Sequence, residues 1–372
     1  MRSNEIKFKD IIKGEKITSF TFFNEVVPFI NKYFYKNNTL NSPFIFDMED
    51  IKSIEPIVIP YLATLGEWCN FKSNFKTIFK VPPTQGSENL QKYLSAIDFK
   101  ENFNTVFYFE SGWQYTSTSE TTRMLKAIKK NTKCSCFNID ELRSVASKIT
   151  RGEVWEYISS VFYTPSYIST RDKYYLDDLL PGEEAYDFSA DATRILAELT
   201  HNALFHGHSN CYLLCEYLSK DRQLKIGLSD FGVGMKKTFD LNRKDIKFKN
   251  DSFKVFKDSE LNDYLHALIE CMMLRIWRKN GLFGVIYTVL SNKGTVRIHA
   301  DRCQIVLSER VSEFFTYDAM LKISEGDVCI KDRFLEHLHW DPEDVERSNV
   351  RRTELFPGVH FEIVMPVPKG YR

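Results

Sequence analysis

Short apolar runs alternate with longer segments of helical periodicity in the first part of the chain. Strand-like runs lie at residues 43–47, 76–81 and 105–109, and helical patterns lie at 56–68, 88–97 and 119–130. Strands that alternate with helices are typical of an α/β layer. We therefore expect residues 1–150 to form a smaller α/β domain.

A connector at residues 151–185 mixes helical signals with prolines and precedes the second part of the chain. Ser189 and Asp191 are capping residues for a helix at 192–206, whose apolar positions recur at helical spacing. Further patterns predict strands at 211–218, 224–228 and 294–299 and a helix at 261–277. The fold class expected for the whole chain is therefore α+β, with a second domain over residues 186–372.

Amino-acid composition and charge exclude several classes of protein. The chain has 43% hydrophobic residues, with 30 Phe and 18 Tyr, which is ample material for packed cores and excludes disorder as the main state. The 50 basic and 50 acidic residues balance, so general binding to nucleic acid or to an anionic membrane is not supported. The most apolar stretch, at residues 54–65, is too short to cross a bilayer. We expect a cytoplasmic protein without a membrane partner.

One candidate site lies in the predicted helix, in the run E-L-T-H-N-A-L-F-H-G. Glu198 and Asn202 are four residues apart and would share a helical face. A carboxamide oxygen can ligate Mg²⁺, and a nearby carboxylate can orient or deprotonate a nucleophile. The alternative is an ordinary solvated helix face.

Two glycine-bearing segments add to this motif. The run D-x-G-x-G places Asp230, Gly232 and Gly234 at the end of a strand, where glycines allow a ligand to approach the backbone closely. Gly281 and Gly284 lead into an apolar helix, whose N-terminus could bind phosphate. Each segment also has a plain alternative, as a turn or as a loop-to-helix junction.

The order of these motifs resembles the GHKL ATPase family, which includes gyrase B, chaperone ATPases and histidine kinases. The similarity is greatest to the anti-sigma-type serine kinases, whose helix motif reads like E-A-x-x-N-A-x-x-H-G. The matching positions are Glu198, Asn202, Ala203, His206 and Gly207. The resemblance covers about residues 186–372 and implies a Bergerat-type α/β sandwich, a mixed sheet with helices on one face.

The resemblance implies a role for each residue of the helix motif and for the strand-end aspartate. Asn202 would be the Mg²⁺ ligand and Glu198 the general base. Asp230 would read the exocyclic amine of adenine, and His206 would belong to the nucleotide-binding motif. The implied cofactors are ATP and Mg²⁺.

The glycines would shape the rest of the pocket. Gly232 and Gly234 would let the backbone close over the nucleotide, and Gly281 and Gly284 would frame its phosphates. The segment at 236–280 would act as a lid. Residues 301–355 interrupt the final strands of the expected fold and are read as an insertion.

The first domain is similar to STAS domains, the regulatory partners of anti-sigma kinases. The similarity lies in a buried strand that ends at Asp47 and is followed by a loop and an apolar helix. Glu55 and Pro56 stand where these partners carry a phosphorylatable hydroxyl. The resemblance therefore implies a docking or sensing module, and the alternative is a generic α/β domain.

Three functions remain open at this point. The first is an ATP-binding GHKL protein in which Mg-ATP binding and hydrolysis drive a regulatory conformational switch. The second is an anti-sigma-type protein serine/threonine kinase, and the third is a non-catalytic scaffold that keeps the fold. The resemblance also implies an unidentified regulatory protein partner, and it allows a homodimer.

Overall fold

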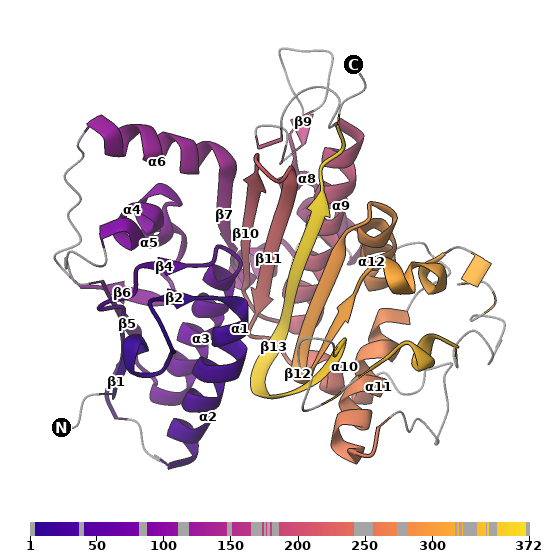
Figure 1. Cartoon of the computed structure of the whole chain (residues 1–372), viewed down its shortest axis with the longest axis horizontal. Coiled ribbons are helices and arrows are strands. Elements are labelled where there is room, and N and C mark those ends of the chain that lie inside the picture. The colour runs from indigo at the N-terminus through magenta and orange to yellow at the C-terminus, as the bar shows by residue number, and fades with distance from the viewer. Residues whose placement is uncertain are drawn as a thin grey trace.

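The computed structural model contains two larger β-sheets, of four and five strands, with helices between and around them (Figure 1). None of the helices in the described residues has the length and apolar character that a membrane span requires. The described residues are 4–36, 41–81, 88–110, 119–146, 151–164, 173–174, 176, 179–180, 186–241, 256–273, 281–316, 318–319, 322, 333–339, 341 and 348–369.

The first sheet is parallel and has the strand order β1-β3-β5-β6. Its strands are β1 (Asn4–Lys7), β3 (Phe44–Asp47), β5 (Thr77–Lys80) and β6 (Phe107–Phe109). The three expected strands are confirmed, whereas β1 was not expected because four residues carry too little pattern. A two-stranded sheet, β2 (Lys16–Ile17) with β4 (Ser53–Ile54), lies beside it. The helices of this part are α1 (Ser19–Thr21), the π-helix η2 (Phe22–Val26), α2 (Val27–Lys36), α3 (Val58–Ser73), α4 (Glu88–Ala96), α5 (Phe99–Asn102) and α6 (Ser119–Asn131), with the 3-10 helix η1 (Phe8–Asp10) after β1.

The second sheet has five strands in the order β12-β13-β11-β10-β7. They are β7 (Thr132–Phe137), β10 (Cys211–Leu218), β11 (Gln223–Asp230), β12 (Thr295–Leu307) and β13 (Val350–Pro366). Every neighbouring pair is antiparallel, so the expectation of a mixed sheet is wrong. Pairing between distant strands sets their direction, and a local pattern does not report it.

The strand β7 lies in the second sheet although it precedes residue 150, because it pairs with β10. The domain boundaries at 150 and 185 stay predictions. Residues 1–150 nevertheless contain more than the first sheet, because β7 belongs to the second. Both ends of the stretch at 301–355 also belong to the sheet, since β12 continues to Leu307 and β13 begins at Val350.

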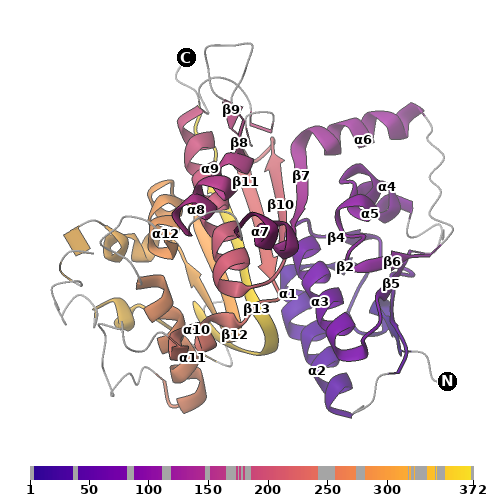
Figure 2. The same cartoon turned by 180° about the vertical axis from the view of Figure 1, so that it is seen from behind.

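Helices of the second part cover one face of the five-stranded sheet, and Figure 2 shows α8 and α9 in front of it. The helix α9 begins at Tyr186, so Ser189 and Asp191 lie inside it and not at its cap. The helices are α7 (Ile139–Ala146), α8 (Arg151–Phe162), α9 (Tyr186–His201), the π-helix η4 (Asn202–Gly207), α10 (Gly234–Leu241), α11 (Ser259–Met273), α12 (Leu282–Ser291) and the 3-10 helix η7 (Glu309–Phe315), with the short strands β8 (Tyr163–Thr164) and β9 (Lys173–Tyr174) near α8.

The other face of this sheet is covered by α3, which belongs to the first part of the chain (Figure 1). Most of its residues are buried, on all sides of the helix. A helix that is apolar all round requires partners on every side. It finds them in β3 and β5 of the parallel sheet and in β10 and β11 of the antiparallel sheet.

Alternate residues of β10 enter the two cores, as the pleat of a strand requires. Cys211, Leu213 and Cys215 pack against the helices of the second part. Tyr212 and Leu214 join the core around α3. Because both faces are buried, the strand reads as a nearly continuous apolar run.

Two glycines set the distance between α3 and its neighbours. A Cβ at Gly66 would collide with the ring of Phe107 in β6 and would lie 2.8 Å from Val106 Cγ1. A Cβ at Gly227 of β11 would lie 2.9 Å from the carbonyl oxygen of Ile57, directly before the helix. Both sheets therefore contact the helix so closely that neither Gly66 nor Gly227 has space for a methyl group.

We expect Gly66→Ala to lower the free energy of unfolding by about 1–3 kcal/mol through overpacking. Helix propensity acts in the opposite direction, because alanine is more favourable than glycine in a helix interior by about 1 kcal/mol. The sign of the measured change therefore shows which effect is larger. Urea denaturation measures the change. Adding Phe107→Leu should make the double variant less destabilised than the sum of the single changes, and a stabilising Gly66→Ala would contradict the close approach.

Candidate functional site

The carboxyl group of Asp230 lies at the end of β11 and is only 3% exposed. Its Oδ1 accepts hydrogen bonds from the backbone N–H of Gly232 at 2.7 Å and of Val359 at 3.3 Å. Burial raises the pKa of this carboxyl to about 7, and the two backbone donors limit the rise. Near neutral pH the group therefore exchanges readily between its neutral and ionised forms.

Three glycines surround this carboxyl group and bring three segments together. A Cβ at Gly232 would lie 2.7 Å from both Asp230 Oδ1 and the Cα of Gly207, at the end of η4. Gly358 of β13 has a φ of +95°, and a Cβ there would collide with the carbonyl oxygen of Asp230. A backbone bond from Val233 N–H to the Gly207 carbonyl closes the arrangement. A side chain would not fit at Gly232 or at Gly358.

The helix motif continues α9 into a π-helix that begins at Asn202. Such wide turns are frequent at functional sites. They change the rotation between residues, so the face shared by Glu198 and Asn202 stays a prediction. Glu198 Oε2 accepts a hydrogen bond from Trp155 Nε1 of α8 at 3.3 Å. The ring of His206 packs edge-on against His201 and belongs to the same segment.

The remaining predicted glycines begin two helices. Gly234 has a φ of +76° at the start of α10, where a Cβ would lie 2.5 Å from Asp301 Oδ1. Gly281 has a φ of +91° and directly precedes α12, and Gly284 lies in its first turn. The helix α12 packs beside α9. Of the expected lid, residues 242–255 and 274–280 lie outside the described residues.

Asp301 is a residue of this region that the sequence pattern missed. Its Oδ2 accepts a hydrogen bond from the backbone N–H of Lys236 at 2.9 Å, which caps the first turn of α10. A local sequence motif does not contain this contact, because the capping carboxylate comes from β12, 65 positions away in sequence.

A buried polar chain behind Asp230 was missed for the same reason. The hydroxyl groups of Thr64 in α3 and Ser229 in β11 are 2.6 Å apart, and Ser229 Oγ lies 2.6 Å from Nδ1 of His360. Burial holds the pKa of His360 well below its usual value, so the ring is neutral. The residue preceding Asp230 is therefore hydrogen-bonded to α3.

A second buried carboxyl group, that of Glu67 in α3, also went unnoticed. It accepts hydrogen bonds from the Tyr212 hydroxyl at 2.7 Å and from Asn210 Nδ2 at 3.2 Å. Burial raises its pKa to about 7. These contacts join α3 to the start of β10, next to the segment that carries the helix motif.

Across the described residues, no three His, Cys, Asp or Glu side chains gather in a way that could hold a metal ion. The sequence expectation for Mg²⁺ does not need such a group, because Mg²⁺ commonly binds one or two protein oxygens together with substrate phosphates and water. The amide oxygen of Asn202 fits that chemistry.

In comparisons with known proteins, no family model, no curated protein and no solved structure matches this chain. The GHKL and STAS resemblances therefore stay predictions: the first depends on its motifs and on the geometry around Asp230, and the second on the strand that ends at Asp47.

Asp230→Asn tests the protonation of this carboxyl group. Because its pKa is raised from 3.8 to about 7 on folding, the proton contributes stability that is complete below about pH 4 and is lost as pH rises through 7. The parent should lose at most about 1.4 kcal/mol per pH unit over that window relative to the variant. Urea denaturation between pH 5 and 8 measures the difference, which should level off above 7. Asp221→Asn, on the exposed β10–β11 turn, should follow the parent, and parallel curves for parent and Asp230→Asn would contradict the assignment.

Proposed function

We propose that this chain is an ATP-binding protein of the GHKL type, in which Mg-ATP binding and hydrolysis drive a regulatory conformational switch. The observation that carries the proposal is the Asp230 carboxyl group, buried at a strand end within a ring of glycines. A buried carboxylate is a strong acceptor for an amino group that leaves water, because the pair forms in a low-dielectric site.

The surroundings of Asp230 favour a flat, amino-bearing ring such as adenine. Among the described residues both backbone donors bind Oδ1, and Oδ2 would be the acceptor for a ligand. Gly207, Gly232 and Gly358 contribute backbone without side chains, so a ring could approach the main chain closely. The site chemistry thus agrees with the role that the family resemblance implies for Asp230.

The phosphates and the metal would lie toward the helix motif and α12. Asn202 would supply an amide oxygen to Mg²⁺, which would neutralise phosphate charge when bound. Glu198 would accept the proton of the attacking water, and Trp155 would orient its carboxylate through the 3.3 Å hydrogen bond. Gly281 would bring free N–H groups of the first turn of α12 to the phosphates.

The conformational switch would depend on the buried hydrogen bonds of Thr64, Ser229 and His360 behind Asp230. Asp230 is joined through its neighbour Ser229 to Thr64 of α3, and α3 is packed against both sheets. A ligand that shifts the end of β11 would therefore strain a contact with the first part of the chain. A regulatory protein that docks on that part would bias the same equilibrium.

A kinase of the anti-sigma type is the second candidate, since it would use the same pocket with a protein hydroxyl in place of water. Glu198 would then deprotonate a serine or threonine. The sequence motif, not the geometry, favours this candidate, and a scaffold that binds no nucleotide is the outcome that would defeat both.

Isothermal titration of Mg-ATP into the intact chain tests the proposal. Asp230→Asn should weaken binding by roughly 5- to 150-fold, equivalent to about 1–3 kcal/mol for a lost buried acceptor. Parent affinity should rise between pH 6 and 8, because the amino group selects the ionised carboxylate whose pKa is about 7. Asp221→Asn is the matched control, and it should bind as the parent does.

Phosphate release separates the remaining outcomes. Asn202→Ala should weaken the binding of Mg-ATP, because it removes the proposed Mg²⁺ ligand. Binding with release that disappears in Glu198→Gln would support an ATPase. Binding without release would favour the kinase and call for protein substrates. Failure of the parent to bind, or equal binding by the parent and Asp230→Asn, would contradict the proposed site.

A further inference from the structure

One face of α3 lies along both segments that carry the sequence motifs around Asp230. Thr64, Glu67 and Phe71 are three and four residues apart, so they share this face. Their partners are, in the same order, Ser229, Asn210 and Phe231. Two of these partners are the neighbours of Asp230 in the chain, and the third follows the helix motif. Three contacts of one helix thus reach both parts of the candidate site.

Phe71 is the most exposed of these three side chains. Its exposed fraction is 68%, whereas Thr64 is fully buried. The centroid of its ring lies 5.9 Å from that of Phe231, with 57° between the ring planes. Aromatic rings attract one another at centroid distances of about 4.5–7 Å. Phe71 can therefore be changed without opening a core, and the change removes a support from Phe231.

Phe231 belongs to the turn that holds the Asp230 carboxyl group. The backbone N–H of Gly232, on the far side of Phe231, donates to Asp230 Oδ1 at 2.7 Å. Side chains alternate along a strand, so the ring of Phe231 lies on the α3 face and the carboxyl group on the opposite face, where its strand partner Cys211 also lies. A change in the backbone torsions of Phe231 would move the two ends of the Gly232–Asp230 hydrogen bond apart.

The last turns of α3 are a fixed support for this contact. Asn70 Nδ2 donates to the carbonyl oxygen of Val106 at 2.8 Å, and Asn70 Oδ1 accepts a hydrogen bond from the backbone N–H of Thr77 at 2.6 Å. These bonds join the helix to β5 and to the residue before β6. Phe71 follows Asn70 directly, so its backbone is held in place by the parallel sheet.

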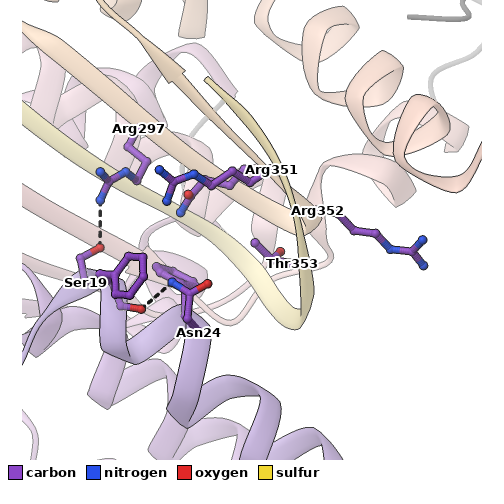
Figure 3. A pocket seen from close by; sticks show the side chains of 9 residues that line it. Ser19, Asn24, Arg297, Arg351, Arg352 and Thr353 are labelled. Carbon is purple, nitrogen blue, oxygen red and sulfur yellow. Dashed lines mark hydrogen bonds between the residues drawn. The ribbon is translucent and has the colours of Figure 1, made fainter. Parts of the chain in front are cut away.

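Polar contacts also hold the first part of the chain level with the start of α3. Arg297 Nη1 donates to Ser19 Oγ at 3.2 Å, beside a small hollow (Figure 3), and to Glu362 Oε2 at 2.7 Å. Glu362 is paired with Gly227 of β11, whose backbone approaches Ile57 directly before α3. The helix is therefore fixed against the antiparallel sheet near its start as well as near its end.

We propose that Phe71 is a positioning residue for the Asp230 site: its ring holds Phe231, and the turn at Phe231 holds the Asp230 carboxyl group where a ligand would meet it. Phe71 itself does not touch the ligand. The inference deepens the proposed function and rests on it for the identity of the ligand, Mg-ATP. The order of the turn can be measured without any ligand, so the two proposals are tested separately.

Amide hydrogen exchange in the ligand-free, intact chain tests the positioning role. Phe71→Ser should speed the exchange of the Gly232 amide by roughly 2- to 12-fold, the factor that corresponds to the free energy of an aromatic pair. The amide of Ile226, in the middle of β11, is the internal reference and should exchange as in the parent. Selective isotopic labelling of glycine and isoleucine lets NMR follow both amides in a chain of this size.

Two further variants separate the ring contact from a general effect of polarity. Phe71→Tyr keeps the ring and should return the exchange of Gly232 to about the parent value. Phe75→Ser alters a neighbouring phenylalanine that is 46% exposed. Among the ring contacts of the described residues, Phe231 pairs with Phe71 and not with Phe75. Phe75→Ser should therefore leave the exchange of Gly232 unchanged.

Isothermal titration of Mg-ATP extends the test to the ligand. Phe71→Ser should weaken binding by the same factor as it speeds exchange, because the loosened turn must be ordered again when the ligand binds. Phe71→Tyr should restore the parent affinity. A parent that binds no Mg-ATP would contradict the proposed function, and the exchange of Gly232 would still decide the role of Phe71.

The positioning role is overturned if Phe71→Ser leaves the exchange of Gly232 unchanged, or if Phe75→Ser speeds it equally. Equal acceleration at Ile226 would also overturn it, because the effect would then be a loss of overall stability. Failure of Phe71→Tyr to restore the parent exchange would exclude the ring contact as the cause. Unchanged affinity of Phe71→Ser for Mg-ATP, beside faster exchange at Gly232, would show that the turn does not position the carboxyl group for this ligand.

Discussion

The burial of α3 on all of its sides over residues 58–66 is the constraint on which the rest of the structure depends. A helix without a polar face cannot be stable at a surface, so the chain must supply two sheets to cover it. The parallel sheet contributes one wall and the antiparallel sheet the other. Gly66 and Gly227 bring those walls to contact distance, because each lies where a methyl group would collide. The two parts of the chain consequently share a core around one helix.

This shared core explains why polar groups lie so deep near Asp230. Thr64, Ser229 and Nδ1 of His360 are hydrogen-bonded to one another inside apolar surroundings, where an unpaired polar group would cost about 1–3 kcal/mol. Burial also lowers the pKa of His299, whose Nε2 lies 2.7 Å from Thr353 Oγ1, to about 3. Both imidazole rings are therefore neutral. Protonating either ring would bury a positive charge away from water. The hydrogen bonds of Thr64, Ser229 and His360 form only when α3 lies in this position against the sheet.

Local patterns predicted individual elements well and their assembly poorly. The strand at 211–218 and the helix after Gly281 were found because their apolar residues and turn glycines are adjacent in sequence. The motifs also contain Asp230, Gly207 and Gly232, which lie together at the end of β11, whereas Gly281 and Gly284 lie at the start of α12. The direction of the strands, the place of β7, and contacts such as Thr64 to Ser229 depend on pairing across long separations. The start of α9 was misplaced because Ser189 and Asp191, good capping residues, are also tolerated inside a helix when neighbours pack around them.

The irregularity of the β12–β13 hairpin connects these features. Its register shifts on both sides of Asp301, which pairs with Phe356 and whose side chain caps α10. Opposite this shift, Gly358 adopts a φ of +95° because the carbonyl oxygen of Asp230 occupies the space that a side chain would need. Without the register shift, we expect β12 and β13 to lose both the cap that Asp301 gives to α10 and the close approach of Gly358 to Asp230. The bulge thus divides β13 into an arm that carries Arg351 and a segment whose Val359 N–H binds Asp230, so the distortion of the strand is the structural basis of the site around Asp230.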